Sequence, residues 1–129
     1  MAEDRKTRIL IVEDASLVRM YYREALEGAG FVVDEALNGL EALEKLLTAP
    51  VDLLVVDVNM PQMDGLTFVK ALRRQTPPIA SIPVLITTTE SSSLDVQAAR
   101  KVGANYYLIK PVSQEQLVVH ARILSGCVI

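Results

Sequence analysis

The sequence predicts an α/β fold: a doubly wound sheet of five parallel strands with helices on both faces. Two observations carry this prediction. Short apolar runs rich in valine, isoleucine and leucine recur along the chain, and a stretch with helical periodicity follows each of them. Continuous apolar runs of this length are typical of strands buried on both faces of a parallel sheet. The expected strands are residues 8–13, 31–36, 51–57, 83–88 and 105–110.

Between these runs, apolar residues recur at the spacing of one helix face. Asp64 and Ser113 stand where the third and fifth helices should begin, and short polar side chains of this kind cap helices. Glu41 and Lys45 are an expected i,i+4 ion pair on the outside of the second helix. The alternation of strand and helix implies right-handed crossovers. The expected core stripes are Val18, Tyr21 or Tyr22, and Ala25; Gly39, Leu43 and Leu46; Leu66, Val69 and Leu72; Leu94, Ala98 and Val102; and Leu117, Ala121 and Leu124.

The composition is that of an ordinary globular protein, with 129 residues of which 50% are apolar and 22% charged. We expect one domain over residues 1–129, because no linker or low-complexity stretch divides the chain. The single cysteine, Cys127, excludes a disulfide within the chain. No apolar run approaches the roughly 18 residues that a membrane span needs. The net charge of −3 also argues against a nucleic-acid or anionic membrane surface, so we expect a cytoplasmic protein that binds neither.

Polar residues lie at the carboxyl ends of four of the expected strands. Glu13 and Asp14 end the first strand and Asp57 ends the third. Thr88 ends the fourth and Lys110 the fifth. Each acid taken alone could be an ordinary residue of a helix N-terminus. Because ligands of open α/β sheets bind along this edge, however, we expect the carboxylates, the hydroxyl and the ammonium to converge.

Such a cluster has a characteristic chemistry. Neighbouring carboxylates raise one another's pKa values unless a cation lies among them. Hard oxygen ligands with room for water suit Mg²⁺. A lysine and a hydroxyl beside that ion can hold the oxygens of a phosphoryl group. The sequence therefore predicts a Mg²⁺-dependent phosphoryl-transfer site.

Four motifs at these positions resemble those of the response-regulator receiver family. They are IVEDAS, DVNMPQMDGL, ITTTE and IKP, and they occur in the order and spacing of the family. The resemblance extends over residues 8–125 and is closest to stand-alone, CheY-like receivers. It implies a flavodoxin-like strand order, 2-1-3-4-5, with residues 8–125 as the core of one receiver domain. The departures are Glu13 in place of an aspartate and Val112 in place of a frequent phenylalanine, and phosphorylation is still expected.

The resemblance also implies a role for each site residue. Asp57 would be the phosphoacceptor nucleophile, and Thr88 and Lys110 would be the catalytic groups that contact the phosphoryl oxygens. Of three adjacent threonines, Thr88 best fits the family's spacing to Lys110, so Thr87 would point to the opposite face of its strand. Asp14 and Asp57 would bind Mg²⁺ directly, Glu13 would act directly or through a water molecule, and Asn59 would contribute its backbone carbonyl.

The implied output is conformational. Thr88 would move toward the phosphoryl group, and Tyr107 would shift inward as a switch residue; the alternative is that Tyr107 is a plain core aromatic. The change would reach a surface made of the fourth helix, the fifth strand and the fifth helix. There, Val119 and Ile123 lie four residues apart outside the core stripe, which favours a docking strip for an effector or a second copy of the chain. They could instead be isolated surface residues or be covered by the tail, residues 127–129.

The expected function is that of a two-component response-regulator receiver. A sensor histidine kinase or a histidine phosphotransfer protein would donate the phosphoryl group. The receiver would catalyse its own phosphorylation and dephosphorylation and is not expected to be an enzyme with a separate substrate. A haloacid-dehalogenase-type phosphatase would need its nucleophile pattern on the first strand, where this chain has Glu13 and Asp14, and a pseudo-receiver would have lost Asp57 or Lys110. The remaining alternative is a receiver cut from a larger DNA-binding or enzymatic regulator, although an end close to the last helix favours a stand-alone protein.

Overall fold

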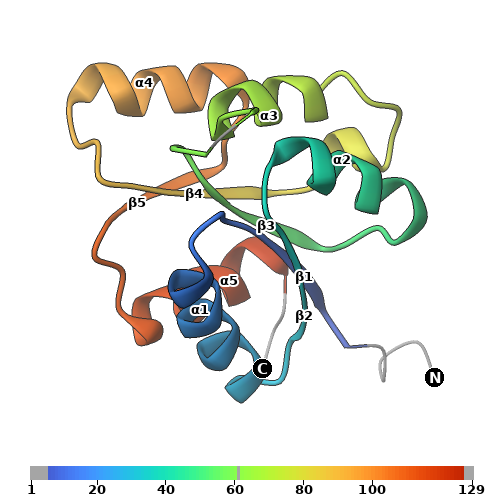
Figure 1. Ribbon diagram of the computed structural model, residues 1–129, viewed down its shortest axis with the longest axis vertical. Helices are drawn as coiled ribbons and strands as arrows, with labels where there is room; N and C mark the ends of the chain where they lie inside the picture. Colours follow the sequence, from blue (N-terminus) through green and yellow to red (C-terminus); the bar gives the residue numbers. More distant parts are fainter. Residues whose placement is uncertain (1–5, 61, 127–129) are drawn as a thin grey trace.

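The computed structural model of the protein describes residues 6–60 and 62–126 (Figure 1). Its five strands form one parallel sheet in the order β2-β1-β3-β4-β5. The α/β class and the strand order are both as predicted, and every strand lies inside its expected run. The strands are β1 (Arg8–Val12), β2 (Val32–Ala36), β3 (Leu53–Asp57), β4 (Val84–Thr88) and β5 (Tyr106–Ile109).

Helices cover both faces of the sheet. They are α1 (Ser16–Gly28), α2 (Gly39–Thr48), α3 (Gly65–Leu72), α4 (Ser93–Val102) and α5 (Gln114–Ser125), with a short 3₁₀ turn, η2 (Ile79–Ser81), before β4. α1 and α5 lie side by side on one face, and α2, α3 and α4 cover the other (Figure 1). In the described part of the chain, no helix is long and apolar enough to cross a membrane.

The sheet divides the core into two halves, because successive residues of a strand point to opposite faces. In β1, Ile9 and Ile11 pack in the half that α1 and α5 cover. Leu10 and Val12 pack in the other half, under α2, α3 and α4. All four side chains are buried, as expected for a strand between two helical layers. The strand ends that carry the candidate site are therefore held firmly on both sides.

Short polar side chains cap four of the five helices. Asp64 and Ser113 accept hydrogen bonds from the backbone N–H three residues on, at 2.9 and 3.0 Å, as predicted for α3 and α5. Asn38 and Ser92 cap α2 and α4 in the same way. α1 differs, because its N-cap residue is Ala15 and no side chain caps it. The turn between β1 and α1 must therefore be fixed by other contacts.

The predicted core stripe of α4 is confirmed only at Val102, which packs against the core. Leu94 is 75% exposed, and Ala99 is the buried residue of this helix. Positions 98 and 99 are both alanine, so the spacing of apolar residues does not distinguish between two neighbouring faces.

The predicted Glu41–Lys45 pair is also replaced by other contacts. Lys45 Nζ lies 3.5 Å from Asp34 Oδ1 and donates to the Glu35 carbonyl, both on β2. Glu41 accepts a hydrogen bond from the backbone N–H of Leu37 at 2.9 Å. Partners on the neighbouring strand and loop thus take the place of a weak contact along the helix.

Candidate functional site

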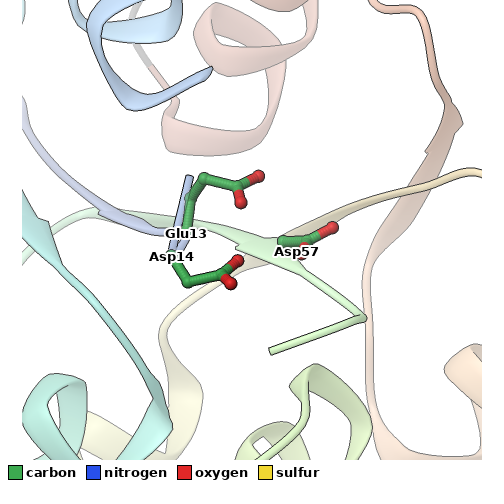
Figure 2. Close-up of side chains that lie close together, drawn as sticks. All are labelled: Glu13, Asp14 and Asp57. Atoms are coloured by element: carbon green, nitrogen blue, oxygen red, sulfur yellow. The ribbon is translucent and has the colours of Figure 1, made fainter. Parts of the chain in front are cut away.

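The candidate site lies at the carboxyl ends of the adjacent strands β1 and β3. Glu13 and Asp14 follow β1 directly, and Asp57 is the last residue of β3. Their side chains extend to the same side (Figure 2). One carboxylate oxygen from each residue lies within 4.8 Å of those of the other two. The structure therefore brings Asp57 next to the consecutive pair Glu13 and Asp14, from which it is distant in the sequence.

Two of these acids are buried. Glu13 is 2% exposed and Asp57 is 4% exposed, whereas Asp14 is open to solvent. Burial raises the pKa of Asp57; the Lys110 ammonium opposes this rise, and the charge of Asp14 adds to it. Burial also raises the pKa of Glu13; the backbone N–H of Ala15 lowers it, and the charge of Asp57 raises it further. Ionised carboxylates at Asp57 and Glu13 are thus energetically unfavourable in this buried cluster, and a bound cation would stabilise them.

Lys110, which follows β5, supplies positive charge to this cluster. Its Nζ lies 3.0 Å from Asp57 Oδ1 and 3.1 Å from Glu13 Oε1. Its backbone N–H donates to the Thr88 carbonyl at 2.7 Å, which ties the end of β5 to the end of β4. Burial lowers the pKa of Lys110, but the hydrogen bonds and charges of Asp57 and Glu13 outweigh burial and raise it overall. The peptide bond between Lys110 and Pro111 is cis.

The donor set fits a Mg²⁺ ion. It consists of carboxylate oxygens, which are hard ligands, and the exposed Asp14 leaves one side open to the water molecules that Mg²⁺ retains. Asn59 lies in the loop after β3, and its backbone N–H lowers the pKa of Asp57. The backbone of Asn59 is therefore next to the Asp57 carboxylate, in the neighbourhood where a carbonyl ligand would be needed.

Thr88 and Tyr107 both contact Glu90. Thr88 is fully buried, and its Oγ1 accepts a hydrogen bond from the Glu90 N–H at 3.1 Å. The Tyr107 hydroxyl donates to the Glu90 carbonyl at 2.7 Å. Burial raises the pKa of Tyr107, and the Thr88 hydroxyl lowers it as a hydrogen-bond partner. Within residues 6–60 and 62–126, Thr88 makes no hydrogen bond to the acidic cluster, so the structure links it to Tyr107 and not to Asp57.

Thr87 faces the other half of the core. It pairs with Asp57 across the sheet, and the alternation along β4 places its side chain with Leu85, toward α1 and α5. Thr87 is fully buried, and its Oγ1 has no hydrogen-bond partner among the described residues. The hydroxyl of Tyr22 on α1 lies close enough for Thr87 to lower the pKa of Tyr22, which burial raises. Neither residue of this buried polar contact stood out in the sequence as part of a site.

Gly65 is a residue of the site that the sequence analysis missed. A Cβ atom at this position would lie 2.4 Å from the backbone oxygen of Asp57. The Gly65 N–H also donates to the Val58 carbonyl at 2.8 Å. The start of α3 therefore packs directly on the backbone that carries Asp57, and only a residue without a side chain fits there. The sequence signal was the Asp64-Gly65 pair, which also suits an ordinary turn.

Comparison with known proteins agrees with this geometry. Residues 9–122 match the response regulator receiver domain family. The chain belongs to the response-regulator receiver family. It is 36% identical over 121 residues to the chemotaxis protein CheY1 of Helicobacter pylori, which covers 92% of this chain and 97% of CheY1. It is 40% identical over 105 residues to a protein-glutamate methylesterase/protein-glutamine glutaminase of Archaeoglobus fulgidus, but it spans 30% of that protein's length.

Solved structures are similar over nearly the whole receiver. The chemotaxis protein CheY4 of Vibrio cholerae superposes with a TM-score of 0.87 at 36% identity, covering 93% of this chain and 99% of CheY4. The receiver domain of a Francisella response regulator superposes with a TM-score of 0.87 at 29% identity, covering 94% of this chain and 98% of that domain. The protein is thus a CheY-like receiver of the two-component type, and receivers of this kind are signalling proteins.

Proposed function

We propose that this receiver accepts a phosphoryl group on Asp57 at a Mg²⁺ site. The observation that carries the proposal is the position of Lys110 Nζ, 3.0 Å from Asp57 Oδ1, beside three carboxylates whose oxygens lie within 4.8 Å of one another. A nucleophilic carboxylate, a fixed ammonium and oxygen ligands for a divalent ion are the parts that phosphoryl transfer requires. The phosphodonor is the phosphohistidine of a sensor histidine kinase or of a histidine phosphotransfer protein.

In the proposed reaction, a carboxylate oxygen of Asp57 attacks phosphorus in line with its bond to the donor imidazole nitrogen. The new O–P bond forms as the N–P bond breaks, and the donor histidine leaves with the bonding electron pair. Lys110 neutralises the charge on the transferred oxygens. Mg²⁺, when bound, stabilises the same charge. Its proposed ligands are the carboxylates of Glu13, Asp14 and Asp57 and the backbone carbonyl of Asn59.

The proposed output begins at Thr88 and Tyr107. Both are hydrogen-bonded to Glu90, so a movement of Thr88 toward a phosphoryl group would break its bond to the Glu90 N–H and change the environment of Tyr107. This change would reach the surface formed by α4, β5 and α5. Val119 is 46% exposed and Ile123 is 68% exposed on that surface, which supports their role in binding an effector or a second phosphorylated copy.

The proposal extends to the organisation of the chain. Residues 1–129 would form one cytoplasmic receiver domain with its core at 8–125, and its chemistry would be limited to its own phosphorylation and dephosphorylation. The family match over residues 9–122 and the near-complete coverage of CheY1 and CheY4 support one receiver domain over these residues. Methylesterase activity is not part of the proposal, because the chain spans 30% of that relative.

Intact-mass spectrometry after incubation with acetyl phosphate and Mg²⁺ tests the proposal. We expect one added phosphoryl group in the parent protein. We expect none when a chelator is present during the incubation, and none in Asp57→Asn. Asp34→Asn is the matched control, since Asp34 is an exposed acid on β2 away from the cluster, and it should be labelled like the parent. Efficient labelling of Asp57→Asn would show that the acceptor is another residue.

A further inference from the structure

Arg19 on α1 binds the backbone of the acidic pair. Its Nη1 donates to the carbonyl oxygens of Glu13 at 2.8 Å and of Asp14 at 2.9 Å. These are the two consecutive residues proposed as Mg²⁺ ligands, and the Arg19 side chain is 14% exposed. Resting on the proposed function above, we infer that Arg19 is a positioning residue, which orients the carboxylates of Glu13 and Asp14 by holding the backbone between β1 and α1.

Glu13 is held from two further directions. Its N–H donates to the Ala36 carbonyl on β2 at 3.0 Å, and its Oε2 accepts the N–H of Ala15 at 3.1 Å. Ala15 is the N-cap of α1 and offers no side chain to cap the helix. Arg19 therefore supplies the side-chain contacts to the two carbonyls that this turn presents.

Arg19 is itself anchored to β2. Its Nε lies 2.8 Å from Glu35 Oε1, and Arg23 binds the other oxygen of the same carboxylate. Arg23 also donates to the Val33 carbonyl at 3.1 Å, but it does not touch the acidic pair. Because Glu35 neutralises the guanidinium, Arg19 acts through geometry more than through net charge. A planar guanidinium with several fixed donors can bind two carbonyls and a carboxylate together, which an ammonium cannot reproduce.

The orientation of this turn matters for a magnesium site in particular. Mg²⁺ requires near-ideal octahedral geometry with short ligand distances, so a small rotation of Glu13 or Asp14 lowers its affinity. Without Arg19, both carbonyls can turn toward water, and the two carboxylates no longer keep a fixed orientation toward Asp57. The fold itself does not depend on this contact, because the strand ladder and both core halves remain.

The experiment compares Arg19→Gln and Arg19→Lys with Arg23→Gln. The Arg23 variant is the matched control, since it loses a guanidinium that shares Glu35 but makes no contact with Glu13 or Asp14. Mg²⁺ binding is measured by calorimetric titration, and amide hydrogen exchange at residues 13–15 is measured in chelator. We expect Arg19→Gln to raise the Kd for Mg²⁺ by roughly tenfold, as loss of a group that orients metal ligands usually does. Metal-free exchange at residues 13–15 should quicken, Arg19→Lys should recover only part of the affinity, and Arg23→Gln should stay near the parent.

Unchanged Mg²⁺ affinity in Arg19→Gln would overturn the inference. An equal loss in Arg23→Gln would also overturn it, because the effect would then reflect general stability. If Arg19→Gln does not fold, Arg19→Lys takes its place in the test. Its Mg²⁺ affinity and its amide hydrogen exchange at residues 13–15 are then compared with those of the parent and of Arg23→Gln. A parent that binds Mg²⁺ with Arg19-dependent affinity, yet takes no phosphoryl group from acetyl phosphate, contradicts the proposed function and leaves the role of Arg19 standing. A parent that binds no Mg²⁺ contradicts both.

Discussion

Lys110 Nζ lies 3.0 Å from Asp57 Oδ1, and this ion pair joins the ends of β3 and β5 at the candidate site. The same ammonium lies 3.1 Å from the buried Glu13, so one positive charge serves two carboxylates. In the free protein, the Lys110 ammonium therefore offsets the negative charge that a metal ion would otherwise neutralise. It is also positioned to bind phosphoryl oxygens.

Replacing Lys110 separates these two roles. In Lys110→Ala we expect labelling by acetyl phosphate to slow by roughly 100-fold, the usual effect of removing one group that stabilises transition-state charge. Mg²⁺ should bind at least as tightly as in the parent, because no ammonium then competes for Asp57 and Glu13. Labelling rates and a Mg²⁺ titration measure the two effects, with Lys101→Ala on the exposed side of α4 as control. A parent-like labelling rate in Lys110→Ala would contradict the assigned role.

The raised pKa of Asp57 predicts how the stability of the metal-free protein changes with pH. A carboxyl group whose folded pKa lies above its unfolded value of 3.8 favours folding most at low pH, and this contribution is lost as pH rises through the folded pKa. Asp57→Asn cannot ionise. We therefore compare the unfolding free energies of Asp57→Asn and the parent. The variant should be only slightly more stable than the parent below pH 3.8. The difference in its favour should grow as pH rises through the folded pKa of Asp57 and then level off.

Urea unfolding of both proteins across this pH range, in chelator, measures the difference. Saturating Mg²⁺ should then narrow the gap at neutral pH, because an ion that binds only the folded parent stabilises it alone. An advantage of Asp57→Asn that shrinks as pH rises would mean that the folded pKa of Asp57 is lowered in solution.

Gly65 and Gly28 form a matched pair for testing the contact under Asp57. A Cβ at Gly65 would meet the Asp57 backbone oxygen at 2.4 Å, whereas a Cβ at Gly28 would meet nothing within 4 Å. Gly65→Ala should therefore lower the unfolding free energy by about 2 kcal/mol or more, because backbone must move to make room. Gly28→Ala, in the last turn of α1, should be neutral or stabilising by up to about 1 kcal/mol.

Chemical denaturation of both variants tests this contrast, and acetyl phosphate labelling adds a second measure. The displacement in Gly65→Ala falls on Asp57, so labelling should slow in folded Gly65→Ala but not in Gly28→Ala. Equal stability of the two variants would show that α3 can shift without disturbing β3.

The strands and the acidic cluster could be predicted from the sequence for a physical reason. Buried parallel strands leave uninterrupted apolar runs, and Glu13, Asp14, Asp57 and Lys110 lie at run ends that the fold must bring to one edge. Periodicity also predicted the core-facing residues of the other four described helices, but not those of α4, whose adjacent alanines suit either face. Contacts between residues that are distant in the sequence leave no periodic pattern of this kind.

Arg19 and Gly65 illustrate the difference. An arginine in the first turns of a helix normally extends into water, and nothing near it in sequence indicates that it reaches the carbonyls of Glu13 and Asp14. A glycine after an aspartate suits a turn, although this one is required by the approach of Asp57. Both facts depend on how β1, β3 and their helices pack, and packing is settled only by the whole fold.

Thr87 offers a test of buried polarity behind the site. Its Oγ1 is buried without a hydrogen-bond partner among the described residues, and a buried unpaired hydroxyl costs stability. Thr87→Val keeps the shape and removes that hydroxyl, so we expect the unfolding free energy to rise by about 1 kcal/mol. Urea unfolding of the variant measures the change. A loss of stability would instead show that Thr87 pairs with the Tyr22 hydroxyl in solution, and Tyr22→Phe should then lose a similar amount.

The surface on β5 and α5 gives the last prediction. Val119 is 46% exposed and Ile123 is 68% exposed on α5. Tyr106 on β5 stacks on His120 of α5 with ring centroids 4.5 Å apart, which joins the strand to this helix, whereas Val119 lines a groove between α5 and α1. If this surface binds a second phosphorylated copy, the double variant Val119→Ser, Ile123→Ser should weaken that dimer by roughly tenfold or more, since two apolar contacts are lost. Labelling of Asp57 should be unchanged.

Sedimentation velocity with Mg²⁺, with and without the phosphoryl mimic fluoroberyllate, measures dimer formation. Leu47→Ser, on the exposed side of α2, is the control for loss of a surface apolar residue. The tail, residues 127–129, lies outside the described residues, and a chain ending at Gly126 tests whether it covers the strip. If the tail covers it, the shortened chain should dimerise more strongly than the parent. Removing the apolar side chains of a dimer contact must weaken the dimer. If the phosphorylated double variant dimerises like the parent, Val119 and Ile123 therefore do not form the contact that phosphorylation strengthens.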